Sequence, residues 1–395
     1  MIHFKHFRQQ WPVGHGFFHS ASLQFEKETY RYVYDCGAGS LKIIENQIDL
    51  YAGNLSLEGQ NHEIDMVVVS HFHADHIKGL PYLLKNFTVR KLVIPHLSED
   101  FKLAALASLA ADGIQSWTLF SELVADPRAW LADRGFNGEI IEVATFGDFL
   151  DILSPMPPSG DGLSLPSGLF NHRNVGTIYS HNTALWFFKF YVHESYETYL
   201  KLLCALCFVF ESDGYDELEL LLRDPAWISA NQKRLKHAFL LLGSGKQNVL
   251  SLCMYSGPEK NRKRHADFSW SPSSYFPSNN YSYYRRGQLG WLATGDAELK
   301  SAAAIGGFEK HYSHYLRNID TVTIPHHGSR DNYNPRLGDI GFRHIITSNH
   351  IKDPKGNHPA TEVMLNLNIK SHFTHVVTAD GASHLFDRIY GWLDL

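Results

Sequence analysis

The sequence predicts an α/β protein, because short strand-like runs alternate with helical segments through its first third. The chain has 395 residues, of which 44% are hydrophobic and 13% aromatic, so it can bury a large core. Only 19% of the residues are charged, which excludes a disordered chain. The formal net charge of -5 excludes a uniformly basic coat for nucleic acid but leaves local basic patches open.

The first third contains a strand–helix–strand unit. The run MVVVS at 66–70 predicts a buried strand, residues 78–86 have helical spacing, and RKLVIP at 90–95 predicts the next strand. Strands are also expected at 21–25 and 30–35, helices over 101–135, and strand character over 140–155.

The middle of the chain is rich in insertions, and we expect a single domain over 1–395 with the insertion-rich region at 156–287. Its predicted elements are a Pro, Gly and Ser-rich loop at 156–174, a strand at 183–192, mainly helical residues at 195–243, a strand at 248–256, a basic and aromatic loop at 257–287, and a strand at 290–296.

No segment is expected to enter a membrane. The N-terminus lacks the continuous apolar stretch of a signal peptide. The longest apolar runs, at 203–210 and 237–243, fall short of the roughly 18 residues that a membrane span needs. We therefore expect a cytoplasmic protein without a membrane partner.

The strongest chemical signal is the run HFHADH, which directly follows the strand at 66–70. Its metal-ligating side chains are those of His71, His73, Asp75 and His76. Imidazole nitrogens with a carboxylate suit zinc, manganese or iron. At the histidine frequency of this chain and roughly 5% Asp, such a run arises by chance with a probability on the order of 0.5%. Alternation along an extended turn predicts one metal on His71 and His73 and a second on Asp75 and His76.

This run resembles the HxHxDH signature of the metallo-β-lactamase fold hydrolases. Further similar segments are VYDCG with Asp35, WLATGD at 291–296, IPHHGS at 324–329 and NHP at 357–359. Together with VGHGFFHSASLQF at 13–25 and NVLSL at 248–252, they are similar to the hydrolase domain of ComEC competence proteins, which act in DNA uptake. The resemblance implies a four-layer αββα sandwich, with inserted helical and loop segments and with metals at the shared edge of two sheets.

The expected roles follow from two divalent ions, zinc or alternatively manganese, that activate a bridging hydroxide. Asp296 is expected to bridge the ions. Of His326 and His327, one is expected to bind the second metal and the other to face substrate, because adjacent residues of an extended chain point to opposite sides. His358 is a candidate for protonating the leaving oxygen.

Two further roles concern residues around the metals. Asp35 is expected to orient a metal-binding histidine rather than to bind metal. Ser329, after a glycine, either holds a substrate oxygen or closes a turn.

One ligand that many relatives use has no clear counterpart. A third histidine for the first metal would come from His96, His172 or His181, and none has a distinctive context. If that position is empty, the first metal site is more open.

A basic run precedes the TGD strand and is expected to lie near the metals. Arg262, Lys263 and Arg264 are followed by aromatic residues, so cations and rings are interleaved. Cations neutralise phosphates while rings stack on unpaired bases, which favours contact with single-stranded nucleic acid. A solvated loop is the alternative.

These features favour a dinuclear metal-dependent hydrolase, and most of all a phosphodiesterase or nuclease that acts on DNA or RNA. Hydrolysis of a small phosphorylated or acyl substrate is the first alternative, because this fold hosts many reactions. The second is a non-catalytic protein that binds a protein partner through the region 156–287.

Overall fold

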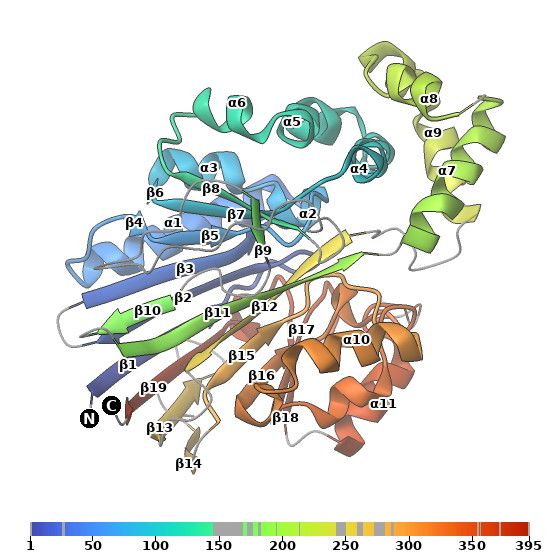
Figure 1. Cartoon of the computed structure of the whole chain (residues 1–395). Helices are drawn as coiled ribbons and strands as arrows, with labels where there is room; N and C mark the ends of the chain where they lie inside the picture. The colour runs from blue at the N-terminus through green and yellow to red at the C-terminus, as the bar shows by residue number, and fades with distance from the viewer. Residues whose placement is uncertain are drawn as a thin grey trace.

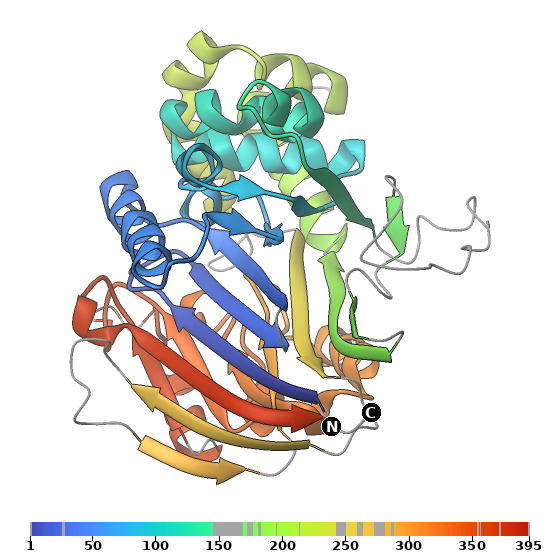
Figure 2. The same cartoon turned by 90° about the vertical axis from the view of Figure 1, so that its left-hand side faces the viewer.

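In the computed structural model, two β-sheets pack face to face with helices on their outer faces (Figures 1 and 2). The structure describes residues 2–25, 28–144, 169–171, 177–180, 183–194, 196–212, 214–241, 250–258, 264–271, 281–285, 288–353, 355, 357–370 and 373–393. The mixed α/β fold confirms the predicted class.

Among these residues, ten strands form the first sheet, in the order β14-β13-β19-β1-β2-β3-β5-β7-β8-β9. They are β1 (Ile2–Gln10), β2 (Phe18–Phe25), β3 (Glu28–Cys36), β5 (Met66–Val68), β7 (Lys91–Pro95), β8 (Glu139–Ala144), β9 (Leu169–Asn171), β13 (Arg264–Ser271), β14 (Tyr281–Arg285) and β19 (Leu385–Leu393). Strands β3, β5, β7, β8 and β9 run parallel to their neighbours in this set.

The second sheet has the order β10-β11-β12-β15-β16-β17-β18. Its strands are β10 (Thr177–Ser180), β11 (Thr183–Glu194), β12 (Leu250–Pro258), β15 (Gly290–Ala293), β16 (Ile319–Thr323), β17 (Arg343–Thr347) and β18 (Phe373–Val377). A small additional sheet pairs β4 (Glu63–Ile64) with β6 (Thr88–Val89).

The helices complete the outer layers. They are α1 (Leu41–Leu57), α2 (Ala74–Ile77), α3 (Leu80–Asn86), α4 (Glu99–Asp112), α5 (Ile114–Ala125), α6 (Pro127–Ala132), α7 (Tyr196–Phe210), α8 (Tyr215–Leu221), α9 (Pro225–Leu241), α10 (Ala302–Tyr312) and α11 (Thr361–Lys370). Helices α1 and α3 lie on the first sheet, and α10 and α11 lie on the second (Figure 1). None of the described helices is both long enough and apolar enough to cross a membrane.

The core between the sheets is aromatic, and buried polar groups fix the register of the two layers. His19 on β2 stacks on Trp291 on β15, with ring centroids 4.0 Å apart. The Tyr34 hydroxyl on β3 donates a hydrogen bond to the Leu252 carbonyl on β12 (2.7 Å). Asp35 follows Tyr34 near the end of β3, and Ser251 precedes Leu252 near the start of β12. This contact therefore brings the end of β3 next to the start of β12.

Two predicted loops contain strands. The described part of 156–174 is the strand β9, and residues 257–287 include β13 and β14, which extend the first sheet beyond β19 (Figure 2). The sequence is compatible with this structure, because RHADFSWS alternates apolar and polar residues from Ala266 onward, the pattern of a strand.

The helical stretch at 195–243 is interrupted at Pro225, as a proline predicts. Helix α8 ends at Leu221, and Pro225 is the first residue of α9, where its missing N–H costs no hydrogen bond.

Candidate metal centre

The candidate centre lies at the carboxyl ends of β3 and β5. Asp35, near the end of β3, has a left-handed backbone (φ 55°). Its two carboxylate oxygens accept hydrogen bonds from the backbone N–H and the hydroxyl of Ser70, both at 2.6 Å. Because Ser70 immediately precedes His71, the carboxylate of Asp35 fixes where the histidine motif leaves the sheet.

The first ligand group consists of His71, His76 and Asp296, whose donor atoms lie within 4.8 Å of one another. The Nε2 atom of His71 is 3.6 Å from Oδ2 of Asp296, and Nε2 of His76 is 3.4 Å from Oδ1. The Asp296 N–H donates to the Ser251 hydroxyl at 3.0 Å, which holds the loop after β15 in place. All three ligand residues are buried.

The second ligand group consists of His15, Asp75 and His327. Oδ2 of Asp75 is 3.3 Å from Nε2 of His327 and 3.9 Å from Nε2 of His15. The side chains of His15 and Asp75 are 34% and 23% exposed, so this group faces the outside. Since Nε2 of His76 is 4.0 Å from Oδ2 of Asp75, the two groups adjoin.

Three imidazoles of these groups have one ring nitrogen held by the protein and the other unpaired. Nδ1 is bonded to Oδ2 of Asp35 in His76 (2.7 Å), to the Ser70 hydroxyl in His71 (2.9 Å) and to the Thr347 carbonyl in His327 (3.0 Å). Their Nε2 atoms are buried and make no hydrogen bond. With Nδ1 donating in these bonds, the neutral ring presents a lone pair at Nε2. A buried acceptor left without a partner is costly, and an imidazole oriented from behind is the usual metal ligand. The residues therefore fit divalent ions in both groups.

His326 and His327 both face the centre, which corrects the expectation that they point to opposite sides. Both adopt a left-handed backbone (φ 48° and 55°) in a turn, so strand alternation does not apply. Nδ1 of His326 is bonded to the Asn332 side chain (2.8 Å), and its Nε2 is 3.8 Å from Oδ2 of Asp296. The ring of His358 lies 5.2 Å from that of His326, and its buried Nε2 makes no hydrogen bond.

The two candidate groups divide the motif differently from the pairing expected along it. Asp75 and His76 fall in different groups, yet Nε2 of His76 is 4.0 Å from Oδ2 of Asp75, so the expected pairing stays a prediction. His73 belongs to neither group, and its Nε2 lies 2.6 Å from the hydroxyl of Ser108 on α4.

Carboxylates and imidazoles shift one another's pKa values across the centre. Burial alone would raise the pKa of Asp75 and Asp296, yet the surrounding imidazoles hold both well below their usual range. Burial disfavours a charged His76, but three carboxylates raise its pKa well above its ordinary value. Next to His327, and partly buried, His15 has a pKa lowered to about 3. Burial, and the neighbouring His326, lower the pKa of His358 to about 4.

His15 is a member that sequence reasoning missed. The backbone at Gly16 lies so close to Asp75 that a Cβ on Gly16 would be 2.7 Å from the Asp75 carbonyl oxygen. The backbone N–H of His15 also donates a hydrogen bond to Oδ1 of Asn349 (2.9 Å). The signal available was the Gly-His-Gly sequence, since a histidine between two glycines suggests a loop that packs closely against another backbone.

The three candidates for a further histidine are not brought to the centre by the described structure. His96 follows β7, and its Nδ1 lies 2.9 Å from Oε2 of Glu142. It belongs to neither ligand group. His172 and His181 lie outside the described residues.

Ser329 is buried and belongs to the turn that carries the two histidines. Its hydroxyl accepts a hydrogen bond from the Asp331 N–H (3.2 Å). This contact is the one expected of a residue that closes a turn.

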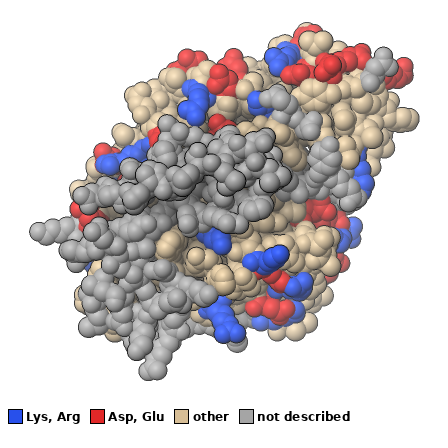
Figure 3. All heavy atoms as spheres, viewed as in Figure 1, with Lys and Arg blue, Asp and Glu red and all other residues tan. Residues whose placement is uncertain are grey.

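The basic run was expected near the metals, but Arg264, the one residue of its three cations that the structure describes, lies far from the candidate centre. Arg264 on β13 pairs with Leu393, which also pairs with Ile2. At the edge of the sheet that carries the candidate centre, β1 ends at Gln10 and β19 begins at Leu385. Leu393, the partner of Arg264, is eight residues farther along β19, so Arg264 lies roughly 25 Å from that edge. Arg262 and Lys263 lie outside the described residues. On the face shown in Figure 3, the described basic and acidic side chains are interspersed.

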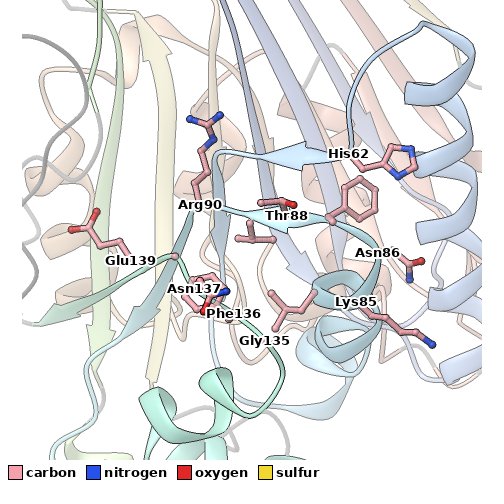
Figure 4. Close-up of a pocket in the computed structure, with 13 residues that line it drawn as sticks. His62, Lys85, Asn86, Thr88, Arg90, Gly135, Phe136, Asn137 and Glu139 are labelled. Atoms are coloured by element: carbon pink, nitrogen blue, oxygen red, sulfur yellow. The ribbon is translucent and has the colours of Figure 1, made fainter.

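A cavity of about 630 Å³ lies away from the centre (Figure 4). It is lined by His62, Phe136 and Arg90, among others, at the amino ends of β7 and β8. The centre is at the carboxyl ends of the parallel strands, so this cavity belongs to the opposite edge and contributes no ligand.

Two packed sheets between helices, with histidine and aspartate groups at their shared edge, define an α/β protein with a candidate dinuclear metal site. Residues 15–163 match the family model of the metallo-beta-lactamase superfamily, so this part of the chain is similar to proteins that are generally metal-dependent hydrolases. The matched segment runs from His15 through Asp35 and the 71–76 motif. No curated protein matches the chain.

Proposed function

We propose that the protein is a two-metal phosphodiesterase that acts on DNA or RNA. The observation that supports this proposal is the pair of adjoining ligand groups, one around Asp296 and one around Asp75. Their nitrogen and oxygen donors suit zinc, with manganese as the alternative. When bound, such ions lower the pKa of a coordinated water to about 7 and neutralise charge on a phosphoryl oxygen.

Asp296 is the residue best placed to be shared by both ions. Its Oδ2 lies 3.6 Å from Nε2 of His71, and its Oδ1 lies 3.4 Å from Nε2 of His76, which is itself 4.0 Å from Oδ2 of Asp75 in the second ligand group. Asp35 orients His76, because its carboxylate accepts a hydrogen bond from Nδ1 and so keeps Nε2 directed at Asp296. These contacts preorganise the donors before substrate binds.

His358 is proposed to contact the leaving oxygen. Its Nε2 is buried without a hydrogen bond, beside the ring of His326. An N–H donated from this atom would stabilise charge that develops on the oxygen. The exposed side of the second ligand group, at His15 and Asp75, leaves an open approach for a large substrate.

A small phosphorylated substrate is the second candidate, and the position of Arg264 favours it. The described part of the basic run lies at the far end of the first sheet and does not provide a phosphate track beside the centre. The two candidates differ in salt dependence, because a polyanion releases counterions on binding and a small substrate does not.

The test is hydrolysis of labelled single-stranded and double-stranded DNA and RNA, and of a chromogenic phosphodiester, with added zinc or manganese. The proposal expects cleavage of a polymer with KM rising steeply between 50 and 200 mM salt. Cleavage of the small ester alone, with weak salt dependence, favours the second candidate. A protein that binds two metals and cleaves none of these substrates contradicts the proposal and favours a partner-binding role.

A further inference from the structure

His73 is held differently from the other histidines of its motif. In His71 and His76 the protein bonds Nδ1 and leaves Nε2 unpaired. In His73 it is Nε2 that is bonded, at 2.6 Å from the hydroxyl of Ser108. A ring nitrogen that carries a hydrogen toward a hydroxyl cannot bind metal, so the atom left as a ligand is Nδ1.

The position of His73 makes such a ligand useful. Its ring centroid lies 4.6 Å from that of His71, a member of the first ligand group. That group lacks the third histidine that was sought at His96, which is paired with Glu142 instead. His73 is thus a candidate to complete the first site, and its orientation decides whether it can.

Ser108 is held in place by a helical module, which we define as α4, α5, α7, α8 and α9. Figure 1 shows α4 beside α7 and α9 at one end of the molecule. The Trp117 indole N–H on α5 donates to the Leu222 carbonyl after α8 (2.9 Å), and the rings of Phe101 on α4 and Tyr199 on α7 lie 5.8 Å apart. Two segments distant in sequence therefore fix the helix that carries this buried hydroxyl.

We infer that Ser108 is a positioning residue that fixes His73 as an Nδ1 ligand of the first metal. The inference rests on the proposed metal centre and deepens it, because it assigns a function at the centre to helix α4. Loss of a hydrogen bond behind a ligand typically weakens metal binding by about 10-fold to 100-fold.

The experiment measures zinc affinity of the full chain by competition with a chromophoric chelator, so it needs no substrate. Ser108→Ala is expected to weaken one of two bound zinc ions by about 10-fold to 100-fold and to leave the other within about threefold. Ser108→Thr keeps the hydroxyl and is expected to restore affinity. Ser121→Ala, at a buried serine on α5, is the matched control and should bind as the unmodified protein does.

Three outcomes would overturn the inference, and a fourth would overturn the proposed function alone. Unchanged zinc affinity in Ser108→Ala would show that the hydroxyl does not position a ligand. Equal loss of both ions together with a lowered Tm would show a general role in folding. A chain that binds no zinc or manganese would overturn this inference and the proposed function together. Selective weakening in a chain that hydrolyses no phosphodiester would overturn the proposed function alone.

Discussion

Oδ2 of Asp35 lies 2.7 Å from Nδ1 of His76, and both side chains are buried. This contact connects the end of β3 to the first ligand group, since Nε2 of the same imidazole faces Asp296. Asp35 itself is held by the backbone and hydroxyl of Ser70. The carboxylate therefore determines which nitrogen of His76 is available to a metal.

Asp35→Asn tests this role. Asn tolerates the left-handed backbone found at this position, so the substitution removes the charge without adding strain. We expect metal affinity about 10-fold to 100-fold weaker, measured by chelator competition. Asp49→Asn, at an exposed aspartate on α1, is the control. Unchanged affinity in Asp35→Asn would contradict the assignment.

The two histidines after Pro325 are expected to respond differently to truncation. His327 belongs to the second ligand group, and its Nδ1 is fixed by the Thr347 carbonyl. His327→Ala should therefore lower the metal content from two ions to one. His326→Ala should keep both ions and lower turnover, because His326 belongs to neither ligand group while its Nε2 still faces Asp296 (3.8 Å). Elemental analysis distinguishes the variants, and the reverse pattern would exchange the two roles.

Buried histidines outside the centre predict a loss of stability in acid. Burial lowers the pKa of His193 and of His384 to about 4, from an ordinary value of 6.5. Between pH 6.5 and 4 the unfolded chain binds more protons than the folded chain, so stability falls as the pH falls through this window. His193→Gln, which cannot titrate, should reduce the loss by on the order of 2 kcal/mol. Urea unfolding at pH 7 and pH 4.5 measures the difference, and an equal loss in variant and parent would contradict it.

A buried ion network joins the two sheets and predicts a large loss on truncation. Arg343 on β17 contacts Asp387 on β19 at 2.7 Å and Asp320 on β16 at 2.7 Å. Arg343→Ala leaves these buried carboxylates without this cation and should cost about 3–5 kcal/mol of unfolding free energy. The control is Arg388→Ala, at the exposed residue that follows Asp387, which should cost less than about 1 kcal/mol of unfolding free energy. A loss below 1 kcal/mol for Arg343→Ala would refute the network's role.

Local sequence patterns predicted the α/β class and the 71–76 motif, because both depend on residues close together in the chain. The apolar run at 66–70 contains the buried strand β5, which ends at Val68, and the motif follows it at 71–76. The same reasoning missed β13 and β14, whose polar alternation was interpreted as a loop. Strand β13 pairs with β19, more than 100 residues away, and such a distant partner leaves no local signal. Strand β14 in turn pairs with β13.

The site was harder to predict, because its members come from distant segments. His15 reaches Asp75 through the close approach of the loop at Gly16, about 60 residues earlier in the chain. Ser108 lies in an alanine-rich helix where nothing in the spacing indicates a contact with His73. The pairing of ligands likewise depends on the start of α2 at Ala74, a boundary that sequence patterns locate only approximately.

The central claim is that two divalent ions at the adjoining groups carry out hydrolysis, with Asp296 shared between them. The most direct measurement is metal content per chain together with phosphodiester turnover, in the unmodified protein and in Asp296→Asn. The account predicts about two ions in the unmodified protein, and in Asp296→Asn a loss of metal and at least a 100-fold loss of turnover. Turnover that persists in Asp296→Asn, or in a fully metal-free chain, would contradict it.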